Sequence, residues 1–118
     1  MYRQNIVIFA ATFVVAMLLI TILRIPVTAM AGADTQAGKV VYDKKCKICH
    51  AAAGEGNPKM AKVMKAEFKH LGSKEVQDKK DDDMKKAIVD GVGKMKAIKE
   101  LSAADVDNVI GYVRTLKK

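Results

Sequence analysis

Two cysteines and a histidine lie within one short segment, Cys46-Lys47-Ile48-Cys49-His50. The chain has no other cysteine, so each of these thiols has only the other as a disulfide partner within the chain. On a turn of helix, residues three positions apart lie on the same face. Two thiols and an imidazole at this spacing can form a dithiol redox pair or a structural disulfide, supply part of a zinc site, or attach a c-type haem.

The rest of the chain favours haem among these possibilities. A thioredoxin-like redox pair needs a βαβ context, and the sequence shows no strand alternation. A zinc site would need further ligands, and the only histidines are His50 and His70, far apart along the chain. A structural disulfide leaves the adjacent histidine without a role. We therefore expect one covalent haem c, with Cys46 and Cys49 forming thioethers to its vinyl groups and His50 ligating the iron.

Iron in such a site usually takes a sixth ligand, and methionine opposite histidine raises the reduction potential. Met84 falls on a helix face, and Met60 and Met64 lie with Val63 and Phe68 on an apolar stripe, where methionine is more often packing than ligand. Met95 instead lies in a glycine-bearing loop, in which the backbone can approach the ring closely. We favour Met95 as the sixth ligand, leave the other three as alternatives, and expect His70 at the surface.

Apolar periodicity predicts a small all-α domain around this motif. The first helix leads directly into the cysteines, acidic residues suit the start of the third, and Ser102 with Asp105 forms a capping-box pair for the last. The predicted helices are Thr35–Lys45, Lys59–His70, Asp81–Asp90 and one beginning after Ser102. Loops are predicted at 51–58 and 91–95, with 73–80 as a loop or one helical turn.

The N-terminal 1–31 segment differs in composition from the rest. Residues 6–23 are an uncharged apolar run of 18 residues, with Arg3 before it and Arg24 after it. The Ala29-Met30-Ala31 pattern indicates a signal-peptide cleavage site, whereas a run of this length is also close to the minimum for an uncleaved membrane anchor. Either way the rest of the chain is expected outside the cytoplasm, in a bacterial periplasm, as a soluble or a membrane-anchored protein. The expected division is 1–31 as signal peptide or anchor, 32–36 as a short linker and 37–118 as the haem domain.

Charge also limits the classes of partner. The formal net charge is +8, and removing residues 1–31 removes Arg3 and Arg24 but no acidic residue, which leaves +6. Arg114 is then the only arginine, and lysine-rich charge without arginine clusters or interleaved aromatics does not match nucleic-acid binding. It fits a docking face for acidic redox proteins. The lysines that flank the expected haem-contacting segments are Lys44, Lys45, Lys47, Lys59, Lys62, Lys94, Lys96 and Lys99.

These features together resemble the class I cytochromes c, especially the short bacterial carriers of a single haem. The resemblance extends over about Ala37–Leu116. It rests on Gly38-Lys39-Val40-Val41-Tyr42 before the motif, the motif itself, the loop Gly54-Glu55-Gly56-Asn57-Pro58, and Asp90-Gly91-Val92-Gly93-Lys94-Met95 before a closing helix that contains Tyr112.

The resemblance implies a small cytochrome c-like fold, with the helices packed around one covalent haem. Its first and last helices would cross near Gly38, with Tyr42 and Tyr112 at the crossing. It also implies His50 and Met95 as the axial ligands. The backbone carbonyl of Pro58 would accept a hydrogen bond from the His50 ring, and such a contact fixes ring orientation at metal sites.

The function implied is that of a single-electron carrier, not an enzyme, which shuttles electrons between extracytoplasmic or membrane-bound redox proteins. A first alternative is a tethered haem subunit of a membrane electron-transfer complex, associated with the bilayer through residues 6–23. A weaker alternative is a haem enzyme or sensor with a labile sixth ligand. It arises because Lys96 follows Met95 where the family often has proline.

Overall fold

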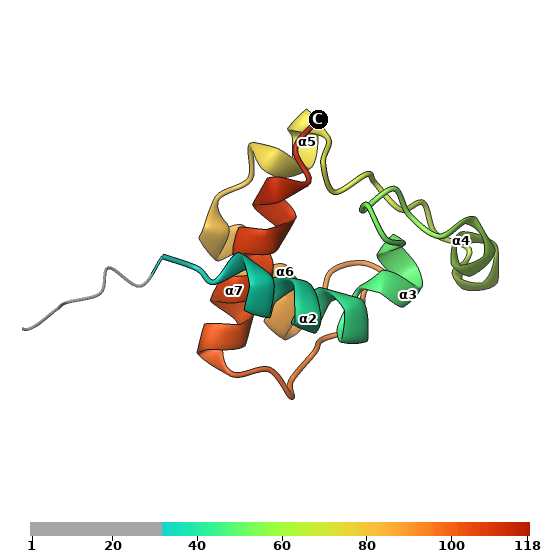
Figure 1. Cartoon of the computed structure of the whole chain (residues 1–118). Helices are drawn as coiled ribbons and strands as arrows, with labels where there is room; N and C mark the ends of the chain where they lie inside the picture. The colour runs from blue at the N-terminus through green and yellow to red at the C-terminus, as the bar shows by residue number, and fades with distance from the viewer. Residues whose placement is uncertain (1–31) are drawn as a thin grey trace, which may run out of the picture. The chain divides into compact units, whose positions relative to one another are not determined.

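The computed structural model describes residues 32–118, which fold as six helices around a small apolar core (Figure 1). Across this range the only β pairing is an isolated bridge between Val92 and Met95. The predicted all-α class is therefore confirmed for the described residues. The helices are α2 (Thr35–Lys45), α3 (Lys47–His50), α4 (Pro58–Met64), α5 (Lys74–Gln77), α6 (Asp81–Asp90) and α7 (Ala103–Thr115).

The main packing contact is the crossing of α2 and α7 (Figure 1). Gly38 is buried at the crossing, where a Cβ atom would lie 1.9 Å from the carbonyl oxygen of Asn108. The rings of Tyr42 and Tyr112 pack next to it, with centroids 5.1 Å apart. Only a residue without a side chain allows the two backbones this close approach. The crossing implied by the resemblance is therefore observed.

The core lies along one face of α7. Seven apolar side chains are buried among the described residues, and four of them form an apolar stripe on this helix. Tyr42 from α2, Val76 from α5 and Met84 from α6 pack against that stripe. The buried set is Tyr42, Val76, Met84, Val106, Val109, Ile110 and Val113.

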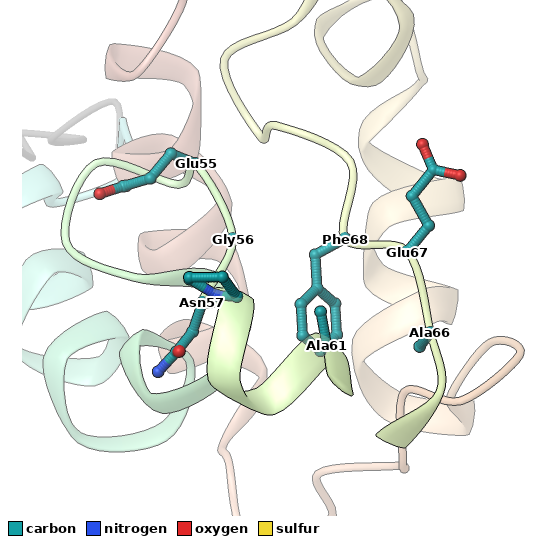
Figure 2. A pocket seen from close by; sticks show the side chains of 8 residues that line it. Glu55, Gly56, Asn57, Ala61, Ala66, Glu67 and Phe68 are labelled. Carbon is teal, nitrogen blue, oxygen red and sulfur yellow. The ribbon is translucent and has the colours of Figure 1, made fainter. Parts of the chain in front are cut away.

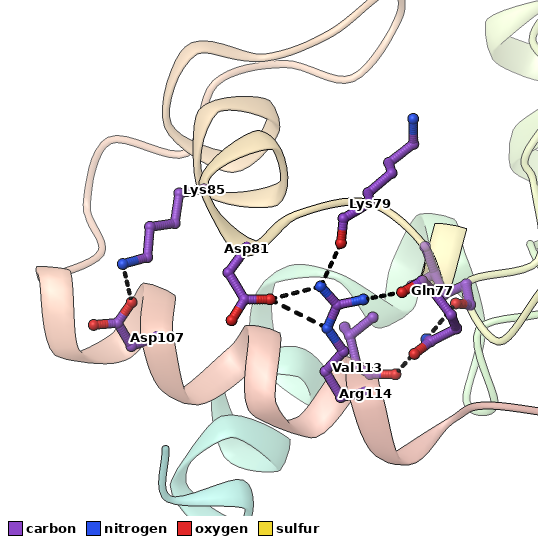
Figure 3. A network of polar contacts seen from close by, with 8 residues as sticks. Gln77, Lys79, Asp81, Lys85, Asp107, Val113 and Arg114 are labelled. Carbon is purple, nitrogen blue, oxygen red and sulfur yellow. Dashed lines mark hydrogen bonds and ion pairs between the residues drawn. The ribbon is translucent and has the colours of Figure 1, made fainter. Parts of the chain in front are cut away.

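Arg114 joins α7 to the turn between α5 and α6 (Figure 3). Its guanidinium donates to the backbone carbonyls of Gln77 at 2.5 Å and Lys79 at 2.6 Å. It also pairs with the carboxylate of Asp81 at 2.6 Å, in the first turn of α6. The planar guanidinium presents several donors in fixed directions. One side chain can therefore satisfy carbonyls at the end of α5 and fix the start of α6.

Local capping residues set the bounds of the outer helices. Ser102 and Asp105 form the predicted capping box of α7. Asp34 caps α2 by accepting hydrogen bonds from Gln36 N and Ala37 N, and its own N–H donates to Asn108 Oδ1 at 2.8 Å. The expected linker 32–36 is therefore partly helical, and its residues 34–36 belong to the folded domain.

The predicted helix Lys59–His70 is wrong at its C-terminal end, because α4 stops at Met64. Lys65 adopts the left-handed conformation, with φ 48° and ψ 52°, and its N–H bonds to carbonyls of the preceding turn. Phe68, counted in the apolar stripe, therefore lies beyond the helix. Val63, from the same stripe, is 76% exposed.

Two segments with open predictions remain, residues 73–80 and residues 1–31. Residues 74–77 form the single turn α5, within the range expected to be a loop or one turn. No helix within residues 32–118 is long and apolar enough to cross a bilayer. The expected signal peptide or anchor at 1–31 lies outside the described residues.

Candidate functional site

The cysteine–histidine motif forms α3, which continues directly from α2. The N–H of Cys46 donates to the carbonyl of Tyr42 at 2.9 Å, as the C-cap of α2. The N–H groups of Cys49 and His50 then both donate to the carbonyl of Cys46, at 3.1 and 2.9 Å. Both thiols are free and half-buried. The prediction that the first helix leads into the cysteines is confirmed.

A short loop and a buried tyrosine hold the C-terminal end of α3. The carbonyl of His50 accepts from Gly56 N at 2.9 Å. The next residue, Ala51, has a positive φ of 62°, an uncommon conformation for a residue with a side chain. The wholly buried Tyr42 donates its hydroxyl to the carbonyl of Ala51 at 2.7 Å. These bonds fix the backbone on both sides of His50.

Burial keeps the first thiol and the imidazole uncharged near neutral pH. It raises the pKa of the Cys46 thiol to about 11, with a smaller contribution from repulsion by Cys49. Burial also lowers the pKa of His50, because the protein excludes the water that would solvate an imidazolium. A neutral imidazole retains the lone pair that a metal ligand needs.

The two ring nitrogens of His50 differ in their surroundings. Nδ1 is buried and has no hydrogen-bond partner among the described residues. The contact with the Pro58 carbonyl expected from the resemblance is therefore not made in this structure, and Pro58 begins α4 as its first residue. An unpaired buried donor costs about 1–3 kcal/mol. This orientation hides Nδ1 in the protein, as ligation through the other nitrogen requires.

The methionines fall into two groups. Met84 is 8% exposed in the core, which confirms its predicted packing role. Met60, Met64 and Met95 are half-buried. Met95 differs from the other two because it closes a tight turn, with paired backbone bonds of 3.0 and 2.9 Å to Val92, instead of lying on a helix. The expected loop position of Met95 is confirmed, whereas its role as a ligand stays a prediction.

His70 is not the surface residue that was expected. Its Nδ1 accepts a hydrogen bond from Gly72 N at 2.9 Å, and its Nε2 is buried without a partner among the described residues. A ring nitrogen that accepts a hydrogen bond from the backbone already uses its lone pair. His70 is therefore a local structural residue of the 70–73 turn.

The surroundings of α3 leave apolar side chains outside the core. Neither α3 nor α4 has a fully buried residue, although α4 carries Met60, Val63 and Met64. The loop before α4 and residues 66–68 line a pocket of about 390 Å³, with Phe68 beside Ala61 (Figure 2). The Phe68 ring centroid lies 5.8 Å from that of His50. A half-buried phenylalanine against His50, directly after two free thiols, fits a large apolar prosthetic group.

Two of the alternative chemistries find no support in the described part of the chain. Three or more His, Cys, Asp or Glu side chains do not gather there as a metal cluster would require. Residues 32–118 also form no βαβ unit, which a thioredoxin-like pair would need. The Cys46–Cys49 pair with His50 therefore favours haem over zinc or dithiol chemistry.

The eight flanking lysines are all exposed, as a docking role requires. Lys45 pairs with Glu100 at 3.6 Å, between the end of α2 and the segment before α7. Such an exposed pair adds little stability. The lysines are Lys44, Lys45, Lys47, Lys59, Lys62, Lys94, Lys96 and Lys99.

Sequence reasoning overlooked two residues at this site. Asn57 caps α4, and an asparagine directly before a proline is a recognisable helix start that would have placed this helix at Pro58. Phe68 lies against His50 only because the chain turns back after Met64. No local pattern indicates that contact.

Comparisons with known proteins agree with this geometry. Residues 35–117 match the family model described as Cytochrome c. Among solved structures, the KustC0563 c-type cytochrome is similar, with a TM-score of 0.58 and 25% sequence identity. The match covers 69% of this chain and 98% of that protein. No curated protein matches the chain.

Proposed function

We propose a function that proceeds from one premise: the chain belongs to the cytochrome c family, as a class I c-type cytochrome. That family implies covalently bound haem c and haem-based electron transfer. Our proposal is that residues 32–118 carry one haem with histidine–methionine ligation and act as a single-electron carrier. When bound, the haem supplies an iron that gains and loses one electron.

The cysteines and the histidine have separate roles in this proposal. Cys46 and Cys49 would hold the group by thioether bonds; Cys46 is the N-cap of α3, Cys49 lies within it, and both are half-buried. His50 would ligate the iron through Nε2, because Nδ1 is buried in the protein. We propose that the Pro58 carbonyl accepts the Nδ1 proton in the loaded protein. A second-shell acceptor of this kind fixes the tautomer and the ring orientation.

Met95 is the proposed sixth ligand, supported by the shape of its loop. Gly93 has φ +55°, which suits the first central residue of the tight turn that Met95 closes. Gly91 has φ +82°, and a Cβ there would lie 2.7 Å from the carbonyl oxygen of Met95. The amide of Ile98 bonds to the carbonyl of Ile88 at 2.9 Å, which ties the end of this loop to α6. The methionine is thus presented by a short, hydrogen-bonded loop.

The observation that carries the proposal is the pair of free, half-buried thiols of Cys46 and Cys49 at the start of α3 and within it, with the half-buried His50 directly after them. The intact mass of the protein, expressed where haem is attached to proteins, tests it. We expect the polypeptide mass plus one haem, and the bare polypeptide for Cys46→Ala with Cys49→Ala. A wild-type chain that never acquires haem would refute the proposal.

The partners and the compartment follow from charge and from the N-terminal segment. We propose acidic redox proteins outside the cytoplasm as partners, because the eight lysines flanking the site are exposed. The same mass measurement reports whether residues 1–31 are removed. A retained segment would favour the tethered-subunit alternative, with membrane association through residues 6–23, and a cleaved one would favour a soluble periplasmic carrier.

A further inference from the structure

We propose that Asn57 is a positioning residue, whose side chain joins the end of α3, and with it His50, to the start of α4. This inference rests on the proposed ligation of iron by His50. The contacts on both sides of Asn57 carry it, and Figure 2 shows the residue at the entry to α4.

On one side, Asn57 bonds to two consecutive carbonyls of α3. Its Nδ2 donates to the carbonyl of Ile48 at 3.0 Å. Its backbone N–H donates to the carbonyl of Cys49 at 2.8 Å, and the neighbouring Gly56 N–H reaches the carbonyl of His50 at 2.9 Å. The last carbonyls of a helix have no partner within it, so Asn57 and Gly56 supply the partners that α3 lacks.

On the other side, the same residue begins α4. Its Oδ1 accepts from Lys59 N at 3.0 Å and from Met60 N at 3.4 Å. Its own carbonyl accepts from Ala61 N at 2.9 Å. The amide therefore has one allowed orientation, because the N–H groups of α4 require the oxygen and the Ile48 carbonyl requires the NH₂ group.

This arrangement matters because neither helix is stable alone. A single turn such as α3 has little intrinsic stability, and among the helices α4 packs mainly against α3. The direction in which the His50 side chain leaves the backbone depends on the conformation of residues 48–51. By fixing the carbonyls of Ile48 and Cys49, Asn57 fixes that direction.

Two substitutions remove the side-chain contact with Ile48, one with the cap of α4 retained and one without it. Asn57→Ser keeps an oxygen that can cap α4 but removes the Nδ2 donor to Ile48. Asn57→Ala removes both contacts. Ser102→Ala is the matched control, because it removes the side-chain cap of α7, a helix that carries no proposed haem ligand.

The test uses the haem-loaded protein and two readouts. The first is the set of haem methyl resonances in the oxidised state, which respond to the orientation of the axial imidazole. The second is hydrogen exchange at the amides of Gly56 and Asn57. We expect Asn57→Ser and Asn57→Ala to shift the methyl resonances and to speed this exchange by about five- to tenfold, the equivalent of one lost hydrogen bond. Ser102→Ala should lower the melting temperature and leave both readouts unchanged.

The inference is overturned if the two Asn57 variants keep the wild-type methyl resonances and only melt earlier, as Ser102→Ala does. Asn57 would then be an ordinary helix cap. A wild-type protein without haem would refute the proposed function instead. In that case, unchanged exchange at Gly56 and Asn57 in Asn57→Ser would still overturn the role of Asn57 in holding α3.

Discussion

Replacing Gly38 by alanine tests the crossing of α2 and α7 on which the fold depends. The new Cβ would lie 1.9 Å from the carbonyl oxygen of Asn108 and 2.5 Å from its carbonyl carbon. Contacts below 3.0 Å are essentially never made by real Cβ atoms, so the two backbones must separate by about 1 Å. Both obstructing atoms belong to the backbone of α7, so no side-chain rotation can relieve the overlap.

Two effects of opposite sign set the magnitude. Alanine favours a helix interior over glycine by about 1 kcal/mol. Overpacking of a close contact costs about 1–3 kcal/mol, and more when backbone must move, while the separation also loosens the packing of Tyr42 against Tyr112. We expect a net loss of about 2–3 kcal/mol in the free energy of unfolding. For a domain of this size that corresponds to a fall in melting temperature of about 10–20 °C.

Gly111→Ala is the matched control for the same measurement. Its Cβ would lie 2.5 Å from the Cβ of Ala33, so residue 33 must shift, but this exposed residue lies in the segment before α2 and not in a packed helix. Urea unfolding followed by circular dichroism should therefore show a strong loss for Gly38→Ala and a change within about 1 kcal/mol for Gly111→Ala. If Gly38→Ala unfolds within about 0.5 kcal/mol of wild type, overpacking does little more than cancel the gain of about 1 kcal/mol in helix propensity, the two backbones need not separate, and the account of the crossing is wrong.

Four further predictions concern the site. Met95→Ala should lower the reduction potential and let the iron bind carbon monoxide. Met84→Ala, the control, should cost about 2–4 kcal/mol of stability and leave the absorption spectrum unchanged. A wild-type spectrum for Met95→Ala would exclude Met95 as the ligand. Tyr42→Phe should lose about 1–2 kcal/mol by urea unfolding, because the Ala51 carbonyl loses its partner. Burial raises the pKa of Tyr42 above its ordinary value of 10.0, so the stability that this tyrosine contributes is complete below pH 10 and is lost as pH rises further. If the free energy of unfolding of the wild type falls no more steeply above pH 10 than that of Tyr42→Phe, this reasoning is contradicted. In the haem-free Cys49→Ala variant, alkylation of Cys46 should keep accelerating well above pH 9.0, because burial, the larger cause of the raised pKa of that thiol, remains when Cys49 is removed. A plateau near pH 9.0 would show that the thiol is solvated. Electron transfer with an acidic partner should slow steeply as ionic strength rises past about 0.1 M, and a rate that ignores salt would exclude docking through the lysines.

Sequence reasoning succeeded where local side chains decide the structure. The helix α2 begins and ends as predicted, and Ser102 with Asp105 marks the start of α7, because caps act within one turn. It failed at the end of α4, because Lys65 adopts a left-handed conformation that neither glycine nor asparagine signals. An apolar stripe that continued through Phe68 concealed the break.

At the candidate site, too, sequence reasoning found the residues whose spacing is local and missed the contacts that depend on the folded chain. The proposed attachment residues were found from sequence because Cys46, Cys49 and His50 lie within five positions and the chemistry proposed for them depends on that spacing. The hydrogen bonds that hold them were not, since Tyr42 reaches Ala51 only after the chain has bent at a positive φ. The buried ring of His70 was likewise missed, because its bond to Gly72 depends on a turn that composition does not specify.

The crossing of α2 with α7 also has a consequence for the order of events during synthesis. The amide of Asp34 finds its partner in Asn108, a sequence separation of 74 residues. Closing so large a loop is entropically unfavourable, and the compensating contacts form only when both ends are present. A chain made from its N-terminus therefore exposes α2 without its packing partner until α7 has been synthesised. During that interval the thiol of Cys46, which packs against the core in the folded domain, stays accessible to any enzyme that modifies it.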